Sequence, residues 1–194
     1  GNNSCGARSV RYGLMRDNVL TIDALLANGG EAAFGPLPED PGGVEGPAFY
    51  RQLVRSMVEL ADRESGEITS RFPKVHRRVG GYNIDALLPP STGKSQRNMA
   101  QLLVGSEGTL AFTRRLTLQL QPIPERKALG ICHFSSFYQA MASTQHIVKL
   151  KPDAVELVDR TLIELALDIP MFRDTLTRHV RGRPDVLLLV EFSG

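Results

Sequence analysis

The stretch LLVGSEGTLAF at residues 102–112 places two apolar segments on either side of Gly-Ser-Glu-Gly. Because both segments are apolar enough to be buried, the chain has to turn sharply between them. Gly105 and Gly108 permit positive φ angles and a close approach of the backbone to another group. Two interpretations stay open on these residues: a helix-to-strand turn with a glycine cap, and a loop whose backbone contacts a ligand. If that ligand were a phosphate, the Glu107 carboxylate would have to point away from it, since like charges repel.

The balance of charge excludes some classes of partner. The 194 residues include 23 Lys and Arg against 21 Asp and Glu, a net charge of +2. So small an excess does not indicate a nucleic acid or an anionic membrane surface as partner. The longest apolar run, VLLLV at 186–190, has the length of a strand and not of a membrane span. We therefore expect a protein without nucleic-acid binding.

The N-terminal residues and the cysteines indicate where the protein resides. The first residues, GNNSCGARS, lack the basic head and apolar body of a signal peptide. Cys5 and Cys132 form neither a CxxC pair nor a zinc spacing, which favours a reducing compartment. The chain also begins without methionine, and two interpretations stay open: a piece of a longer protein, and a processed or tagged terminus.

The first part of the chain mixes strands and helices. Asn28-Gly29-Gly30 predicts a hairpin between two short strands within 18–34. Apolar residues at spacings of three and four, starting just after Pro47, predict a helix over 48–63. The other elements predicted here are a loop over 35–47, a helix over 95–103 that stops near Gly105, and a strand within 109–124 that alternates at 116–120 and is ended by Pro122 and Pro124.

The pattern changes after Pro124 to β-α-β-α-α-β. The predicted elements are a strand over 128–134, a helix over 135–150 with Ser135 or Ser136 as N-cap, a strand over 153–158, helices over 159–167 and 171–180, and a strand over 184–194. A sheet built in this order usually continues, so an end just after a strand indicates an incomplete domain. The two parts are expected to divide near 122–126, as domains 1–123 and 124–194.

Two segments have the residue types of a phosphate site. STGKS at 91–95 looks like the end of a P-loop, but Leu88 stands where that motif needs its first glycine. An ordinary solvated loop is therefore favoured over a nucleotide triphosphatase. The small residues of GNNSCGARSVRYG at 1–13 would let main-chain N–H groups reach a phosphate, and a disordered terminus is the alternative.

The titratable residues do not indicate a catalytic or metal centre. His76, His133, His146 and His179 lack metal-ligand spacing, and the carboxylates form no evident pair for glycosidic chemistry. The cluster RHVRGR at 178–183 is typical of a solvated helix end and not of a nucleic-acid surface. No metal site is predicted, and the catalytic residues remain unassigned.

Taken in order, several segments resemble one family. They are NNSCGARSVRYG (2–13), DNVLTIDALLANGG (17–30), GGYNIDAL (80–87) and LLVGSEGTLAFTRRLTLQLQPIP (102–124). They are similar to the FAD-linked oxidases of the vanillyl-alcohol oxidase type, in the D-lactate dehydrogenase and glycolate oxidase branch. DAVELVDRTLIELA (153–166) and LLLVEFSG (187–194) resemble the start of that branch's cap domain. The resemblance implies an α+β chain: the second half of a PCMH-type FAD-binding domain, with antiparallel strands and flanking helices, followed by the incomplete start of a ferredoxin-like cap domain.

The same resemblance implies which residues contact FAD. The loop that would wrap the pyrophosphate through main-chain N–H groups consists of Asn2, Asn3, Ser4, Cys5, Gly6 and Ala7. Gly105, Ser106, Glu107 and Gly108 would line the other side, and the backbone near Phe112 would approach the adenine. The chain departs from the family at Ala111, where glycine is usual, and in a longer segment around 88–98. In the family, the histidines that act as base or metal ligands come from a later region.

The implied activity belongs to a longer parent protein. It would be an FAD-dependent oxidoreductase that oxidises a small D-2-hydroxy acid, such as D-lactate or glycolate, by hydride transfer to flavin. Electrons would pass to a quinone, a cytochrome or an iron–sulfur centre, and the wording of 2–13 looks most like members fused to an iron–sulfur domain. The protein would be cytoplasmic or peripheral at the membrane. The isolated chain is expected to bind FAD weakly or not at all, and self-association into a homo-oligomer would cover its exposed apolar surface. The alternative is a non-catalytic interaction module that does not bind FAD.

Overall fold

The computed structural model describes residues 2–75, 77–89 and 96–194. The STGKS segment at 91–95 and His76 lie outside the described residues. The chain divides into two compact units. The first consists of Gly1–Cys5 and Gly13–Gln121, and the second of Gly6–Tyr12 and Pro122–Gly194. Each unit is described by itself.

The first unit contains an antiparallel sheet with the strand order β2-β1-β3. Its strands are β1 (Val19–Leu25), β2 (Glu31–Phe34) and β3 (Phe112–Leu118). The predicted hairpin is confirmed: Gly29 has a φ of +80°, and the Leu26 N–H donates to the Gly30 carbonyl at 2.8 Å. β3 lies within the strand predicted over 109–124, and it pairs with β1 from Phe112 to Leu118.

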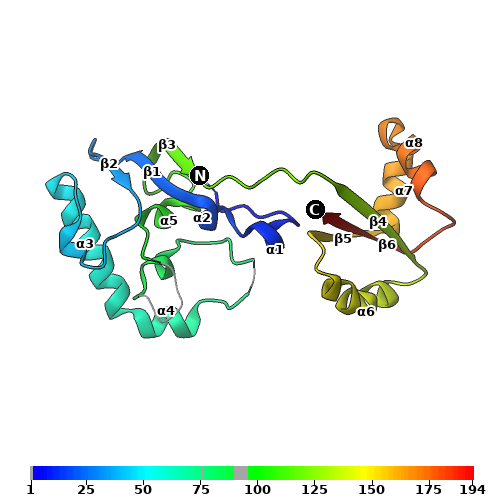
Figure 1. Ribbon diagram of the computed structural model, residues 1–194, viewed down its shortest axis with the longest axis horizontal. Helices are drawn as coiled ribbons and strands as arrows, with labels where there is room; N and C mark the ends of the chain where they lie inside the picture. Colours follow the sequence, from blue (N-terminus) through cyan, green and yellow to red (C-terminus); the bar gives the residue numbers. More distant parts are fainter. Residues whose placement is uncertain (1, 76, 90–95) are drawn as a thin grey trace. The chain divides into compact units, whose positions relative to one another are not determined.

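Helices pack against one face of this sheet (Figure 1). The predicted helix over 48–63 is confirmed as α3 (Ala48–Arg63). The other helical segments are α2 (Met15–Asn18), η1 (Pro41–Gly43), α4 (Ser65–Arg71), η2 (Ile84–Leu87) and α5 (Met99–Leu103).

The helix α5 begins later than the sequence predicted. The Asn98 side chain accepts a hydrogen bond from the Ala100 N–H at 2.8 Å and so caps the helix there. The backbone just before it is extended and pairs with another segment: the Leu37 N–H donates to the Arg97 carbonyl at 2.7 Å. These long-range bonds, which local propensity does not contain, stop the helix from extending toward residue 95.

The core of the first unit is formed by the inner face of the sheet, α3 and α5. The Phe34 and Tyr50 rings meet edge to face, with centroids 5.1 Å apart at 73°. Burial of Tyr50 raises the pKa of its phenol to about 12. Other buried members are Val19, Ile22, Ala24, Leu37, Val54, Val58, Ala61, Leu87, Met99, Leu102 and Leu103. Each fully buried aliphatic side chain stabilises the fold by roughly 1.5–3 kcal/mol relative to exposure.

The second unit contains a sheet with the order β4-β6-β5. Its strands are β4 (Lys127–Phe134), β5 (Ala154–Asp159) and β6 (Val186–Ser193), and β6 is antiparallel to both neighbours. α6 (Phe137–Ile147) and η3 (Val148–Leu150) connect β4 to β5, so that β6 lies between two strands joined by a helix. This split β-α-β arrangement is the opening of a ferredoxin-like fold.

The remaining helices of the second unit complete the predicted order. They are α7 (Arg160–Asp168) and α8 (Pro170–His179). The short α1 (Ser9–Tyr12), which was not predicted, also belongs to this unit. Of the two predicted N-caps, Ser136 is the one used, and its side chain accepts from the Gln139 N–H. The α+β class with antiparallel strands and flanking helices is confirmed. Among the described residues, no helix combines the length and apolar character needed to cross a membrane.

Candidate functional site

The loop after α5 is shaped by hydrogen bonds within it. The buried Ser106 donates twice to the Leu103 carbonyl, from its N–H at 3.2 Å and its Oγ at 2.8 Å. Thr109 in turn donates to the Ser106 carbonyl from its N–H at 2.9 Å and its Oγ1 at 2.6 Å. Gly105, Glu107 and Gly108 all have positive φ angles, of 89°, 51° and 86°. The loop is therefore a defined tight turn in which a non-glycine residue, Glu107, accepts a left-handed conformation.

Two of the predicted loops meet at Gly105 and Asn3. A Cβ atom on Gly105 would lie 3.2 Å from the Asn3 Cβ and 3.6 Å from the Gly81 carbonyl oxygen. The first distance is tighter than ordinary van der Waals contact, so only glycine lets the two backbones approach this closely. Within the first unit, the structure thus brings together members of two separate predicted loops.

The Asn3 side chain carries an unused donor. Asn3 is 2% exposed, and its Oδ1 accepts from the Arg16 N–H at 3.0 Å. That bond fixes the amide orientation, because only the oxygen can accept. The buried Nδ2 then has no hydrogen-bond partner among the described residues. An unsatisfied buried donor costs about 1–3 kcal/mol, and an acceptor atom on a ligand would remove that cost.

The other predicted contact residues of the first unit are more exposed. Ser4 donates from its Oγ to Asn2 Oδ1 at 2.6 Å, and Cys5 is a half-buried free thiol. Glu107 and Gly108 are exposed, and among the described residues no hydrogen bond uses their amide N–H groups. Phe112 begins β3 with 69% of its surface exposed.

Gly6 and Ala7, the last two residues of the predicted pyrophosphate loop, belong to the second unit. Gly6 is exposed with open space where a Cβ would lie, and Ala7 is half-buried. The segment that follows is held to the second unit by ion pairs. Arg8 Nη2 binds both carboxylate oxygens of Glu191, at 2.8 and 2.9 Å. This hydrogen-bonded carboxylate raises the pKa of the Arg8 guanidinium.

The second ion pair of this segment involves a buried carboxylate. Arg11 binds Asp153, which is 5% exposed, and donates from Nη1 to Ser193 Oγ at 2.6 Å. Hydrogen bonds from Ser193 and then from Arg11 lower the pKa of the Asp153 carboxyl below its ordinary value. The Arg11 pKa is raised by the same pair.

Sequence reasoning assigned no role to Asn83, which the structure places at the centre of the first unit's loops. Asn83 is 1% exposed, and its Nδ2 donates to the carbonyls of Val104 at 2.7 Å and Gln101 at 3.1 Å. Next to it, the Tyr82 hydroxyl is hydrogen-bonded to Thr109 Oγ1 at 2.9 Å. The sequence signal for Asn83 is the GGYNIDAL segment at 80–87, which is one of the segments that resemble the family.

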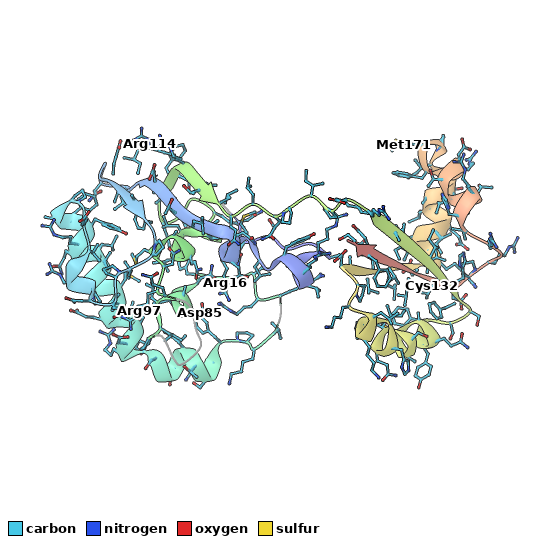
Figure 2. The ribbon with its side chains drawn as sticks, in the orientation of Figure 1. Arg16, Asp85, Arg97, Arg114, Cys132 and Met171 are labelled. Atoms are coloured by element: carbon cyan, nitrogen blue, oxygen red, sulfur yellow. The ribbon has the colours of Figure 1, made fainter. Side chains whose placement is uncertain are left out.

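Arg16 and Asp85 form an ion pair next to Asn83 (Figure 2). Arg16 Nη1 lies 3.2 Å from Asp85 Oδ2 and 3.2 Å from Asn83 Oδ1. Asp85 is also paired with Arg78, at 2.5 Å. Arg16 and Arg78 thus share the Asp85 carboxylate, and Arg16 Nε also lies 3.6 Å from Asp17 Oδ1.

A cavity of about 640 Å³ lies elsewhere in the first unit. None of its lining residues is a predicted contact residue, and its carboxylates, Asp23, Glu31 and Glu45, would repel a pyrophosphate. Its arginines, Arg114 and Arg115, are already paired with Glu31 and Asp23. This cavity does not fit the phosphate part of FAD. Among the described residues, no cluster of three or more His, Cys, Asp or Glu could hold a metal ion.

Comparison with known proteins relates the chain to flavoenzymes. Residues 123–194 match the family described as FAD linked oxidases, C-terminal domain. A D-2-hydroxyglutarate dehydrogenase of Pseudomonas putida is 30% identical over 84% of this chain and 16% of that protein. The Escherichia coli protein of the same name is 26% identical over 97% of this chain and 19% of its own length. A mitochondrial D-lactate dehydrogenase (cytochrome) of Arabidopsis thaliana is 25% identical over 81% of this chain and 19% of that protein.

The chain therefore spans less than a fifth of the length of these relatives. A solved structure of an alkyldihydroxyacetonephosphate synthase matches the whole chain with a TM-score of 0.52 and 15% identity, over 27% of that chain. At this identity the match supports the fold alone. The family match over residues 123–194, the relatives and the fold agree with the predicted resemblance to the FAD-linked oxidases, in the branch of the D-lactate dehydrogenases.

Proposed function

We propose that the chain is part of an FAD-dependent dehydrogenase that oxidises a D-2-hydroxy acid, and that its first unit contacts the FAD pyrophosphate at Asn3 and the 105–108 loop. The observation that carries the proposal is the buried, unpartnered Nδ2 of Asn3 next to Gly105. A buried amide donor beside a glycine with no side chain fits a phosphate oxygen, which is a strong acceptor.

The 105–108 loop supplies further donors for the same group. The unused N–H groups of Glu107 and Gly108 belong to residues with positive φ, a backbone arrangement typical of anion-binding turns. The Glu107 side chain is exposed, so its carboxylate can remain in water and away from the phosphate. Asn2, Ser4, Cys5, Gly6, Ala7, Ser106 and Phe112 remain predicted contact residues on the strength of the resemblance.

The substrate class rests on the relatives, which are named as dehydrogenases of D-2-hydroxyglutarate and D-lactate. Oxidation of a 2-hydroxy acid removes a hydride from C2 and a proton from the hydroxyl group, and yields the 2-oxo acid. FAD, when bound, supplies the acceptor for the hydride. A base for the hydroxyl proton is not assigned among the described residues. An electron acceptor such as a quinone or cytochrome completes the cycle.

Several finer expectations remain predictions. They concern glycolate as a substrate, fusion to an iron–sulfur domain, the location in the cell and self-association.

The decisive experiment uses the full-length protein and its visible spectrum. We expect a flavin spectrum that bleaches on anaerobic addition of D-lactate or D-2-hydroxyglutarate. A flavin spectrum that neither acid bleaches would remove the substrate class and keep the cofactor. A colourless protein that does not bind added FAD would overturn the proposal and favour the non-catalytic interaction module.

A variant pair tests the proposed contact itself. Asn3→Asp keeps the acceptor for the Arg16 N–H but replaces the free donor with a negative oxygen, so FAD should bind at least about tenfold more weakly. Asn28→Asp is the control and should bind FAD like wild type, because Asn28 Oδ1 also accepts from a backbone N–H, that of Gly30 at 3.0 Å, and Asn28 is not a predicted contact residue. Equal FAD affinity in wild type and Asn3→Asp would exclude Asn3 as a contact.

A further inference from the structure

The two loops that meet at Asn3 and Gly105 are also joined by a second, hydrogen-bonded route. The Arg16 N–H donates to Asn3 Oδ1 at 3.0 Å, and the Arg16 side chain donates from Nη1 to Asn83 Oδ1 at 3.2 Å. Asn83 then donates from Nδ2 to the Val104 carbonyl, immediately before Gly105. One residue, Arg16, thus binds one loop through its backbone and reaches the other through its side chain.

The hydrogen-bonding groups of the Asn83 side chain are all used in this connection. Its amide has two N–H donors and one oxygen, and the structure uses the donors on Val104 and Gln101 and the oxygen on Arg16. At 1% exposure, no water replaces a lost partner cheaply. An aspartate would present oxygens to two carbonyls, so asparagine is required here by hydrogen-bond chemistry.

An ion pair with Asp85 orients the Arg16 side chain. Asp85 Oδ2 lies 3.2 Å from Arg16 Nη1, and Asp85 Oδ1 pairs with Arg78. Arg78 is in turn placed over the Phe72 ring, 4.9 Å from its centroid. The Arg16 side chain is only 22% exposed, so this ion pair is less screened by water than a surface pair.

We propose that Arg16 and Asn83 are positioning residues for the two loops proposed to contact FAD, the one that contains Asn3 and the one at 104–109. This inference rests on the proposed function, because it concerns how the site for FAD is held. The link fixes the 104–109 loop against Asn3 before the cofactor arrives. FAD binding then does not have to order two separate loops. The conformational entropy cost of binding is therefore smaller, and the affinity is higher.

The test compares Arg16→Met with Arg97→Met in the full-length protein. Arg16→Met keeps the backbone N–H bond to Asn3 and the apolar stem, and loses the link to Asn83 and Asp85. Arg97→Met is the matched control, since the Arg97 side chain is 13% exposed and binds Asp62 and the Leu88 carbonyl in the same unit. Figure 2 labels both arginines. A milder second variant is Asp85→Asn, which weakens the orientation of Arg16 and leaves Asn83 intact.

Three measurements are made on each variant. FAD titration gives the dissociation constant, ³¹P NMR at saturating FAD reports the pyrophosphate environment, and hydrogen exchange of the 104–109 amides in the flavin-free protein reports the loop without any cofactor. For Arg16→Met we expect about a tenfold rise in the FAD dissociation constant, shifted ³¹P resonances and faster amide exchange. In Asp85→Asn, the dissociation constant, the ³¹P resonances and the amide exchange rates should change in the same direction but by smaller amounts. In Arg97→Met, all three should be the same as in wild type.

The outcomes separate this inference from the function on which it rests. If wild type binds FAD, and Arg16→Met and Arg97→Met have the same dissociation constant and ³¹P spectrum, the positioning role is wrong and the proposed function stands. If 104–109 amide exchange is the same in wild type and Arg16→Met, the link itself is refuted. A wild-type protein that does not bind FAD would overturn the proposed function, and this role with it.

Discussion

Asn3 and Gly105 lie against each other in the first unit, and a Cβ added to Gly105 would lie 3.2 Å from the Cβ of Asn3. Almost the whole first unit separates the two residues in the sequence. Their contact joins the loop at the start of the chain to the loop between α5 and β3. Because the resemblance assigns these loops to opposite sides of the same pyrophosphate, their meeting is the structural basis of the proposed function.

Replacing Gly105 with alanine should destabilise the first unit by about 1–3 kcal/mol. The φ of +89° is unfavourable for alanine, and the new methyl group would press on the Asn3 side chain. Urea unfolding of the two variants measures the effect. The control is Gly66→Ala in α4, where nothing lies within 4 Å of the added Cβ, and which should be neutral or stabilising. Equal stability of the two variants would contradict the strain at Gly105.

Asp153 should make the second unit sensitive to acid. Because its pKa in the folded state is lowered from 3.8, its contribution is fully present above the unfolded pKa and is lost as the pH falls through the folded pKa. We therefore expect the acid unfolding curve of Asp153→Asn, measured by circular dichroism, to be less steep than that of wild type below about pH 4. The control is Asp174→Asn, at an exposed position on α8, which should unfold like wild type. Superimposable acid curves for wild type and Asp153→Asn would rule out this linkage.

The neutral form of the His133 ring should be a single tautomer. Its Nε2 accepts from the Arg181 N–H at 3.1 Å, so the ring proton lies on Nδ1, which is 3.1 Å from the Ile131 carbonyl oxygen. Nitrogen-15 chemical shifts of the ring at neutral to alkaline pH measure the tautomer. His146 in α6 is the reference, and should show the mixture typical of a solvated ring. A proton found on Nε2 of His133 would contradict the hydrogen bond from Arg181.

Ser136→Ala should destabilise the second unit by about 1 kcal/mol. Its Oγ accepts from the Gln139 N–H at the start of α6, and alanine leaves that donor without a side-chain acceptor. The neighbouring Ser135→Ala is a close control, because Ser135 Oγ binds the Gln139 side chain and not the helix backbone. The melting temperature of Ser136→Ala should be lower than that of Ser135→Ala. The reverse order would contradict Ser136 as the residue that caps α6.

The elements that the sequence predicted well are those whose information lies within a few residues. The Asn28-Gly29-Gly30 turn, the extent of α3 and the alternation of strands and helices after Pro124 all appear in the structure, although the fully buried face of α3 is Tyr50, Val54, Val58 and Ala61, one residue further along than the spacing indicated. The predicted start of α5 was wrong because long-range backbone pairing determines where the helix begins, through the bond from the Leu37 N–H to the Arg97 carbonyl. Local propensity does not contain such a bond.

For the candidate site, the residue types alone indicate which loops have the small residues and turn geometry needed to approach a phosphate. The tertiary structure alone decided that Asn3 contacts Gly105, that Asn83 and Arg16 link their loops, and that residues 6–12 bind Glu191 and Asp153 in the second unit. The reason is physical. A turn depends on the conformational preferences of its own residues, whereas a buried donor or charge is defined by partners that only the folded chain brings within hydrogen-bond distance.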